Sequence, residues 1–131
     1  MKYIKYLGLH IDNNLRFDEH INRVSSKIAR SLGVMNRIKE LVPVSNTSIS
    51  KILYFSLIYP YFNYCIEIWG STLQYHINKL VLLQKRAVRI VKDVHFLHHT
   101  DELFNEMKLL RLNDIYKFNI GLYMYQKSWI C

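Results

Sequence analysis

Positively charged side chains are the residues in this sequence whose type and spacing best fit a chemical task. Steps of three, four and seven residues place them within one sector of a helix. Such rows neutralise successive phosphates of a nucleic-acid strand and release its counterions, and arginine can hold a phosphate through two hydrogen bonds. They predict phosphate binding, and the open alternative is a solvated helix face. The first row is Arg23, Lys27, Arg30 and Arg37, and the second is Lys85, Arg89 and Lys92 with Arg86 beside them.

Tyrosine is the second residue type that suits a nucleic-acid partner, with ten in the chain. Aromatic rings stack on unpaired bases, each stack contributing ~1–3 kcal/mol. Tyr3 and Tyr6 are the better candidates, because a strand surface presents rings flat. A second cluster lies among apolar residues, where tyrosine packs its ring and leaves its hydroxyl in water. These core candidates are Tyr54, Tyr59, Tyr61 and Tyr64.

The acidic residues do not form a catalytic metal site. Each aspartate stands apart from the others, at positions Asp12, Asp18, Asp93, Asp101 and Asp114. Without an Asp-Asp pair to hold two divalent metals, metal-dependent phosphoryl transfer is not expected from this chain. The sequence also has no phosphate-cradling glycine loop and no Gly-x-Ser-x-Gly turn. We therefore expect no cofactor in this chain.

A histidine cluster near Asp101 is the remaining candidate for metal binding. It consists of His95, His98 and His99. The usual zinc spacings and the cysteines that accompany them are missing, so a solvent-exposed loop is the favoured interpretation.

The composition suits one compact, mainly helical domain that attracts polyanions. The chain has 131 residues, half of them apolar, with four glycines and two prolines. It can therefore bury a core, and it is not a loop-rich β protein. The net charge of +8 and the pI of about 9.5 favour nucleic acid as the partner. An anionic membrane or an acidic protein comes next.

Cysteine usage and the first residues indicate an intracellular protein of the nucleus or cytoplasm. Cys65 and Cys131 form no disulfide framework, and the N-terminal residues do not resemble a signal peptide. The uncharged stretch 52–66 is shorter than the ~20 apolar residues that a membrane-spanning helix needs. We expect this stretch in the core and no membrane as partner.

The elements that position these side chains are predicted from apolar spacing. The predicted fold class is mainly α, a multi-helix bundle preceded by a short N-terminal β-strand or hairpin. Residues 3–12 read as one strand, followed by a turn at 12–14. This strand needs a partner strand, either within a hairpin or outside this chain.

Expected core residues are Phe55, Leu57, Trp69, Leu83 and Val88, and Gly33 is expected where another helix approaches closely. Helices are predicted over 17–42, ended by Pro43, over about 46–69 with an interruption at Pro60, and over 72–93, 101–109 and 112–127.

Short motifs follow one another along nearly the whole chain. They are Lys5-Tyr6-Leu7-Gly8-Leu9-His10-Ile11-Asp12 with His20-Ile21, then Asn63-Tyr64-Cys65 and Trp69-Gly70, then Leu83-Gln84-Lys85-Arg86-Ala87-Val88-Arg89-Ile90, then Leu112-Asn113-Asp114 with Tyr116-Lys117-Phe118. In order and spacing, the set resembles the segment after the catalytic palm in reverse transcriptases of non-LTR retrotransposons, the jockey-like and related LINE-type elements. The resemblance lies in the ordered set rather than in any single motif.

The resemblance implies two parts with different roles. Residues 1–15 resemble the primer grip, a β-hairpin that holds the primer end near the catalytic metals. Tyr6, Leu7 and Gly8 would belong to this grip. Residues 16–131 resemble the helical thumb and its C-terminal extension, which clasp the template–primer duplex.

The same resemblance implies partners and an absent catalytic centre. RNA, DNA or their hybrid would be bound through the backbone, with Lys85, Arg86 and Arg89 as candidate contacts. The aspartate pair of the family, and the Mg that the full enzyme would use, belong to the upstream palm. This chain alone is therefore not expected to add nucleotides, and a palm-bearing polymerase is a further expected partner.

Three alternatives stay open from the sequence. The first is a protein-interaction module, which predicts an exposed apolar patch where a neighbouring domain once packed. The second is binding to the surface of an anionic membrane through the tyrosine-rich second helix. The third is a remnant of a mobile element without present function.

Overall fold

The computed structural model describes residues 3–41, 47–95 and 97–130, which form a β-hairpin followed by seven helices. The mainly helical fold class with an N-terminal hairpin is thereby confirmed. The strands are β1 (Tyr3–Tyr6) and β2 (Leu9–Asp12). The helices are α1 (Asp18–Leu41), α2 (Thr47–Leu57), α3 (Tyr59–Asn63), α4 (Ile66–Trp69), α5 (Gln74–Lys92), α6 (Asp101–Met107) and α7 (Leu112–Ile130). Pro43, the predicted end of the first helix, lies outside the described residues.

The single strand predicted over 3–12 is wrong, because the chain reverses in its middle. Leu7 and Gly8 both have positive φ, 51° and 85°, and they connect antiparallel strands in which Tyr6 pairs with Leu9. A two-residue loop with two positive φ angles matches the twist of a hairpin, and glycine adopts that conformation without strain. Of the two pairings considered for this segment, the hairpin within the chain is the one observed. The turn expected at 12–14 follows β2.

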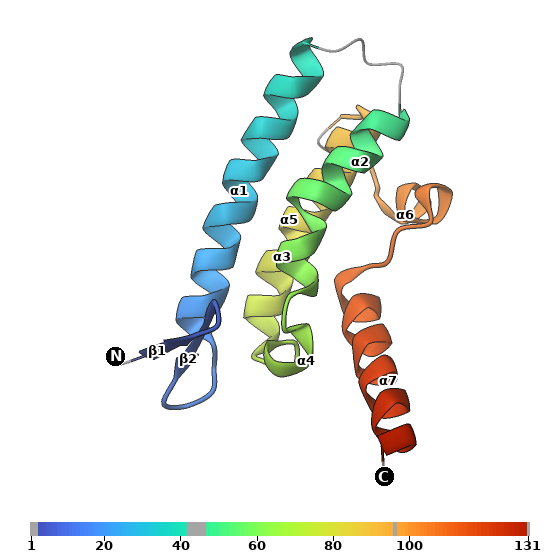
Figure 1. The fold of residues 1–131 in the computed structure, drawn as a ribbon. Helices are drawn as coiled ribbons and strands as arrows, with labels where there is room; N and C mark the ends of the chain where they lie inside the picture. Colours follow the sequence, from blue (N-terminus) through green and yellow to red (C-terminus); the bar gives the residue numbers. More distant parts are fainter. Residues whose placement is uncertain (1–2, 42–46, 96, 131) are drawn as a thin grey trace.

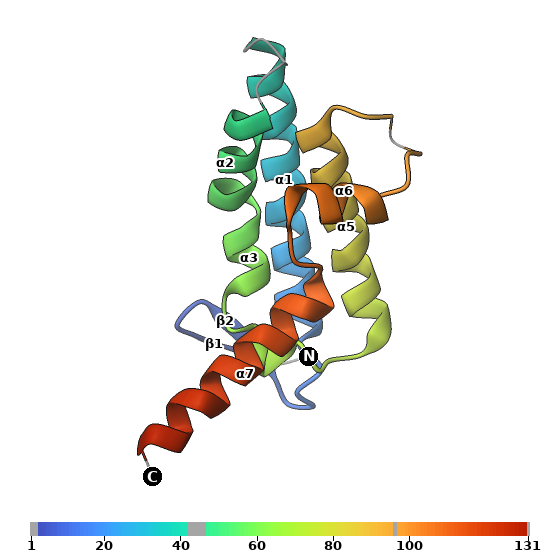
Figure 2. The same ribbon diagram turned by 90° about the vertical axis from the view of Figure 1, so that its right-hand side faces the viewer.

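Three long segments run side by side as the centre of the bundle. In Figures 1 and 2, α1 and α5 run in the same direction, and α2 and α3 run in the opposite direction beside them. The Asp18 carboxylate contacts His76 Nε2 at the N-terminal ends of α1 and α5. At the opposite ends, Lys39 Nζ lies 3.6 Å from the Asp93 carboxylate. Contacts at both ends thus fix the register of the two parallel helices.

The second predicted helix is divided at places other than Pro60. The helix α2 ends at Leu57, and Pro60 lies in the first turn of α3. Proline is tolerated there, because the N–H group that it lacks has no partner in the first turn of a helix. A second break occurs at Cys65, whose φ of 54° separates α3 from α4. The predicted interruption at Pro60 is therefore corrected to breaks around Ile58 and Cys65.

One core joins the hairpin, the central helices and the start of α7. Trp69, Leu83 and Val88 are buried as predicted, and Leu57 is half-buried against the core. Phe55 is 45% exposed, so its predicted core position is wrong. The buried face of α2 contains Ser50 and Tyr54, and the residue after Tyr54 points about 100° away from that face. None of the helices within the described residues has the length and apolar character needed to cross a membrane.

Candidate nucleic-acid interface

In the cation row of α1, the side chains other than Arg23 point to solvent. Lys27, Arg30 and Arg37 are exposed, and within the described part of the chain none of them forms a hydrogen bond or an ion pair. Helical periodicity places all three on the side away from the buried residues Ile21 and Ile28. Their charges are thus available to an anionic partner without breaking an internal contact.

Arg23, the fourth member of this row, is engaged inside the protein. Its Nε lies 2.7 Å from a Glu19 carboxylate oxygen, and its Nη2 donates to the Tyr3 hydroxyl over 2.7 Å. The guanidinium also lies over the Tyr3 ring, 5.6 Å from its centroid. Arg23 therefore fastens β1 to α1, and it is less available for phosphate than the rest of the row.

In the cation row of α5, two side chains bind other groups within the protein. Lys92 forms an ion pair of 2.8 Å with Glu106 on α6, and this contact lowers the pKa of the Glu106 carboxyl. The Nε of Arg89 donates to the His98 carbonyl over 2.8 Å, and Lys85 is half-buried. The residues predicted as one binding row thus include two that brace the connection between α5 and α6.

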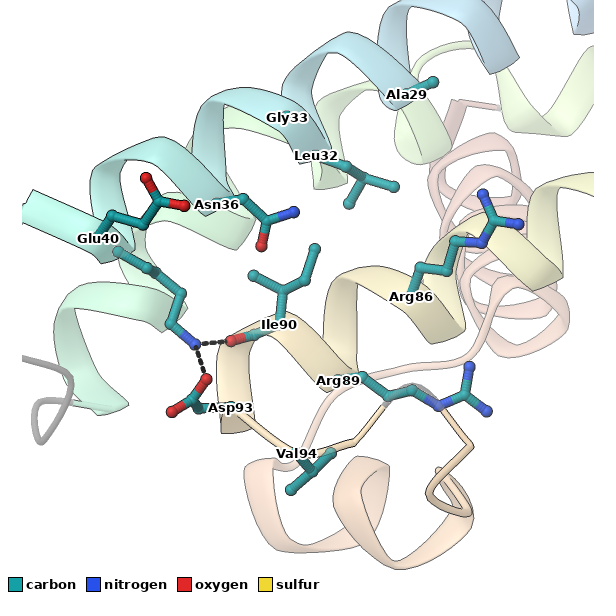
Figure 3. Close-up of a pocket in the computed structure, with 11 residues that line it drawn as sticks. Ala29, Leu32, Gly33, Asn36, Glu40, Arg86, Arg89, Ile90, Asp93 and Val94 are labelled. Atoms are coloured by element: carbon teal, nitrogen blue, oxygen red, sulfur yellow. Dashed lines mark hydrogen bonds and ion pairs between the residues drawn. The ribbon is translucent and has the colours of Figure 1, made fainter.

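Arg86 differs from the rest of its row because it lines a groove between α1 and α5. The groove has a volume of about 760 Å³, and its apolar lining includes Leu32, Ile90 and Val94. Figure 3 shows Arg86 and Arg89 along its α5 side. A smaller hollow of about 340 Å³ shares Arg86 and extends the groove toward the N-terminal half of α5. Among the residues that the structure describes, Arg86 has no hydrogen bond or ion pair.

Gly33 lies on the α1 wall of this groove. An added Cβ would meet no atom within 4 Å, so the predicted close approach of another helix at Gly33 is wrong. The cation row of α1 lies on the next face of the helix, at positions that do not line the groove. The α1 row and Arg86 therefore lie on neighbouring but separate surfaces.

The hairpin tip carries Tyr6, Leu7 and Gly8 at the surface. Tyr6 is 64% exposed and Leu7 is 74% exposed. The Tyr64 hydroxyl donates to the Leu7 carbonyl, and the Tyr64 ring lies 3.7 Å from the position of a Cβ on Gly8. The prediction that Tyr64 packs in the core is wrong, since it is 48% exposed and holds the tip instead. No sequence signal indicated this contact, which joins residues far apart in the chain.

Two buried histidines lie beneath the hairpin, and the sequence analysis missed them. His10 on β2 and His20 on α1 are 6% and 3% exposed, with ring centroids 6.3 Å apart. Burial, with smaller effects of His10 and Lys27, lowers the pKa of His20 from 6.5 to about 4. Burial followed by the charge of Arg23 also lowers the pKa of His10. Near neutral pH both rings are therefore neutral and pack between hairpin and helix.

Several of the acidic residues act as partners of basic groups or backbone groups. Asp12 accepts from the Arg16 N–H, Asp18 contacts His76, and Asp101 pairs with Arg111 at 3.1 Å. In the described ranges, no three histidine, cysteine or acidic side chains converge on a point where a metal ion could be held. His95, His98 and His99 are exposed.

Comparison with known proteins gives relatives among the polymerases of mobile elements. The chain is 25% identical over 112 residues to the RNA-directed DNA polymerase from mobile element jockey of Drosophila melanogaster. It is 24% identical over 114 residues to the probable RNA-directed DNA polymerase from transposon X-element of the same organism. Each match covers 84% of this chain, and the chain spans 12% of the length of each relative.

A third relative supports the same similarity. The probable RNA-directed DNA polymerase from transposon BS of Drosophila melanogaster is 23% identical over 105 residues, which is 80% of this chain and 12% of that protein. No protein-family model matches the sequence. No solved structure matches the fold. The similarity therefore links this chain to a short part of long polymerases of non-LTR retrotransposons.

Proposed function

We propose that this chain binds the backbone of RNA, DNA or their hybrid without sequence preference, as a thumb-like part of an RNA-directed DNA polymerase. The observation that carries the proposal is the row of Lys27, Arg30 and Arg37, which is exposed and free of partners in the described residues. The similarity over most of the chain to polymerases that act on nucleic acid supports it.

The dimensions of the α1 row suit a phosphate backbone. Residues 27 to 37 rise about 15 Å along the helix axis, which corresponds to about four phosphates of one strand of a duplex. Phosphates docked there displace counterions, and no internal ion pair has to break. Arg86, with its unpaired guanidinium, gives a second contact on the neighbouring groove.

The hairpin supplies the second part of the proposal. Its tip would contact the end of a bound strand, with Tyr6 as the exposed ring and the backbone of Leu7 and Gly8 beside it. Tyr64 braces this tip by donating a hydrogen bond to the Leu7 carbonyl, and Arg23 holds the other end of the hairpin through the Tyr3 hydroxyl. A braced loop positions a strand end at lower entropic cost than a free one.

Nucleotide addition is not proposed for this chain alone. The aspartates lie apart, and each is engaged with another group or exposed at the surface. The metals and their ligands would come from a palm domain, with which this chain would share the template–primer duplex.

Fluorescence anisotropy with single-stranded RNA, duplex DNA and RNA–DNA hybrid, across a salt series, tests the proposal. The wild-type chain should bind all three, with affinity falling steeply as salt rises. The triple variant Lys27→Ala, Arg30→Ala, Arg37→Ala should bind about a hundredfold more weakly, with a log–log salt slope smaller by about 3.

A second triple variant controls for net charge. Arg16→Ala, Lys117→Ala and Lys127→Ala remove three exposed cations away from the row, so both triples change the net charge equally. The control should lose less than about tenfold in affinity. Equal losses in both triples, or no binding by the wild-type chain at low salt, would overturn the proposal.

A further inference from the structure

The groove between α1 and α5 continues into the smaller hollow beside it, and together they form one long depression. The groove has a volume of about 760 Å³ and the hollow about 340 Å³, and Ala29 and Arg86 line both of them. On α1 the two parts extend from Ser25 to Glu40, which is about 22 Å along the helix axis. The depression is thus as long as a helix of about four turns.

The α1 wall of this depression is built from small residues. Ser25, Ala29 and Gly33 recur every four residues, so they follow one side of the helix, centred about 100° from the buried Ile28. Ala29 and Gly33 are exposed, and a Cβ on Gly33 would meet no atom within 4 Å. Because the distance between packed helices depends on the side chains at their contact, this wall lets a further helix approach closely.

Ser25 gives an independent indication that an occupant is missing. It is 6% exposed, and its hydroxyl has no hydrogen-bond partner in the part of the chain that the structure describes. It lines the hollow together with Leu82 and Leu83, of which Leu82 is 61% exposed. Buried polar groups normally have a partner, and exposed apolar side chains beside a hollow favour binding. An occupant with both apolar and polar groups would satisfy this end of the depression.

The charges around the depression are almost all positive. No acidic residue occurs in α5, or in α1 between its first turn and Glu40. Arg86 and Arg89 line the α5 wall, and Arg86 has no internal partner among the described residues. At the C-terminal end, Asp93 lies 3.6 Å from Lys39, which leaves Glu40 as the acid without a nearby cation in that pair. The walls therefore attract an anionic occupant and repel a basic one.

We propose that the depression binds an acidic amphipathic helix of a partner protein. Apolar side chains of that helix, three and four residues apart, would pack on Leu32, Leu83 and Ile90, and its carboxylates would pair with Arg86. The bases of a nucleic-acid strand fit less well, because they stack on aromatic rings and no aromatic side chain of the described residues lines the depression.

A second copy of this chain does not supply such a helix from its described residues. The helices with a net negative charge are α4 and α6, which have four and seven residues and are too short to fill the depression. Helices α1 and α5 carry mainly positive charge. The occupant is therefore a different protein. The inference goes beyond nucleic-acid binding and shares only Arg86 with it, because Lys27, Arg30 and Arg37 do not line the depression.

Fluorescence anisotropy of synthetic peptides with the nuclease-treated full chain tests the proposal. The first peptide has about 18 residues, with leucines on one helical face and glutamates on its flanks. The second has the same residues in an order that spreads the leucines around the helix, and the third has lysine in place of glutamate. The first should bind with a Kd of about 10–100 μM, and the other two at least about tenfold more weakly.

Two matched glycine variants locate the binding. Gly33→Gln places a side chain in the groove, and Gly121→Gln adds the same side chain on α7. Both glycines are exposed within a helix, and a Cβ at either meets no atom within 4 Å. Both variants should therefore raise helix propensity equally and keep the fold, which circular dichroism checks. Gly33→Gln should bind the acidic peptide at least about tenfold more weakly, and Gly121→Gln should bind it as the wild type does.

The outcomes separate this proposal from nucleic-acid binding. No binding of the acidic peptide at about 1 mM, equal binding of its reordered form, or binding unaffected by Gly33→Gln would overturn the proposal. An equal loss of RNA and peptide affinity in Gly33→Gln would also overturn it and assign the groove to nucleic acid. We expect Gly33→Gln to bind RNA as the wild type does, whereas the α1 triple variant should lose more affinity for RNA than for the peptide.

Discussion

Helices α1 and α5 lie parallel and carry lysines and arginines at the same helical spacing, yet their cations meet different surroundings. In the α1 row, Lys27, Arg30 and Arg37 point to solvent without internal partners in the described structure, whereas Arg23 is engaged. On α5, Lys92 is paired with Glu106, and Arg89 holds the His98 carbonyl. The same sequence pattern thus gives three exposed cations without partners among the described residues in one helix and structural braces in the other.

The difference follows from the positions of the helices in the bundle. Helix α5 contacts α1, α2, α6 and α7, whereas α1 contacts mainly β2, α2 and α5. A central helix has neighbours on more of its faces, and some of its charged side chains therefore find partners. A row of cations is a stronger candidate for phosphate binding when it lies on a helix face that no other element contacts.

The structural role of α5 depends most on Gln84, which is fully buried. Its Nε2 donates to the Tyr54 hydroxyl over 3.1 Å and to the Leu110 carbonyl over 2.9 Å, and its Oε1 accepts from the Leu112 N–H over 3.0 Å. Gln84→Leu would leave these three groups without a partner. We expect a loss of about 4 kcal/mol in the free energy of unfolding, measured by urea denaturation.

Gln74 offers a matched control on the same helix. It is exposed, and its side chain bonds only to Asn78 among the described residues. Gln74→Leu should change the free energy of unfolding by less than about 0.5 kcal/mol. Similar losses in the two variants would show that Gln84 does not link α5 to α2 and α7 as described.

On α1, the buried ring of His20 should make the stability of the protein depend on pH. The pKa of His20 is about 4 in the folded chain and near its ordinary value of 6.5 when unfolded. The unfolded chain therefore binds the proton first, so stability is full above pH 6.5 and falls as the pH drops toward 4. The expected loss is about 3 kcal/mol over this range, measured by urea denaturation at several pH values.

His20→Gln and His99→Gln separate this effect from general acid destabilisation. His20→Gln removes the titrating ring and should flatten the pH profile between 6.5 and 4. His99 is exposed, so His99→Gln should keep the wild-type profile. If the profile of His20→Gln remained as steep as that of the wild type, the buried ring would not be its cause.

The smallest expected effect is on nucleic-acid binding by the α5 row. The triple variant Lys85→Ala, Arg89→Ala, Lys92→Ala removes as much charge as the α1 triple, but two of its cations are already engaged. Its affinity should fall by less than about tenfold, and its stability by about 1 kcal/mol or less. An affinity loss larger than that of the α1 triple would reverse the comparison and place the binding row on α5.

Composition and spacing were enough to predict the fold class and most of the helices. Periodic apolar residues placed the first and third predicted helices close to the observed α1 and α5, because burial of one face follows a period of 3.6 residues. The prediction failed at the hairpin turn, since Leu7-Gly8 lies within an alternating pattern that continues on both sides of it. It also failed at Phe55, where several faces of α2 are apolar and only packing selects the buried one.

By itself, the sequence determined that this is a basic, mainly helical chain with two rows of cations and without an aspartate pair. Helical spacing is local, and each row follows from a few neighbouring residues. Only the tertiary structure decided which cations stay free, that Tyr64 holds the hairpin tip and that His10 and His20 are buried together. Those features depend on contacts between residues far apart in the chain, and local spacing carries no information about them.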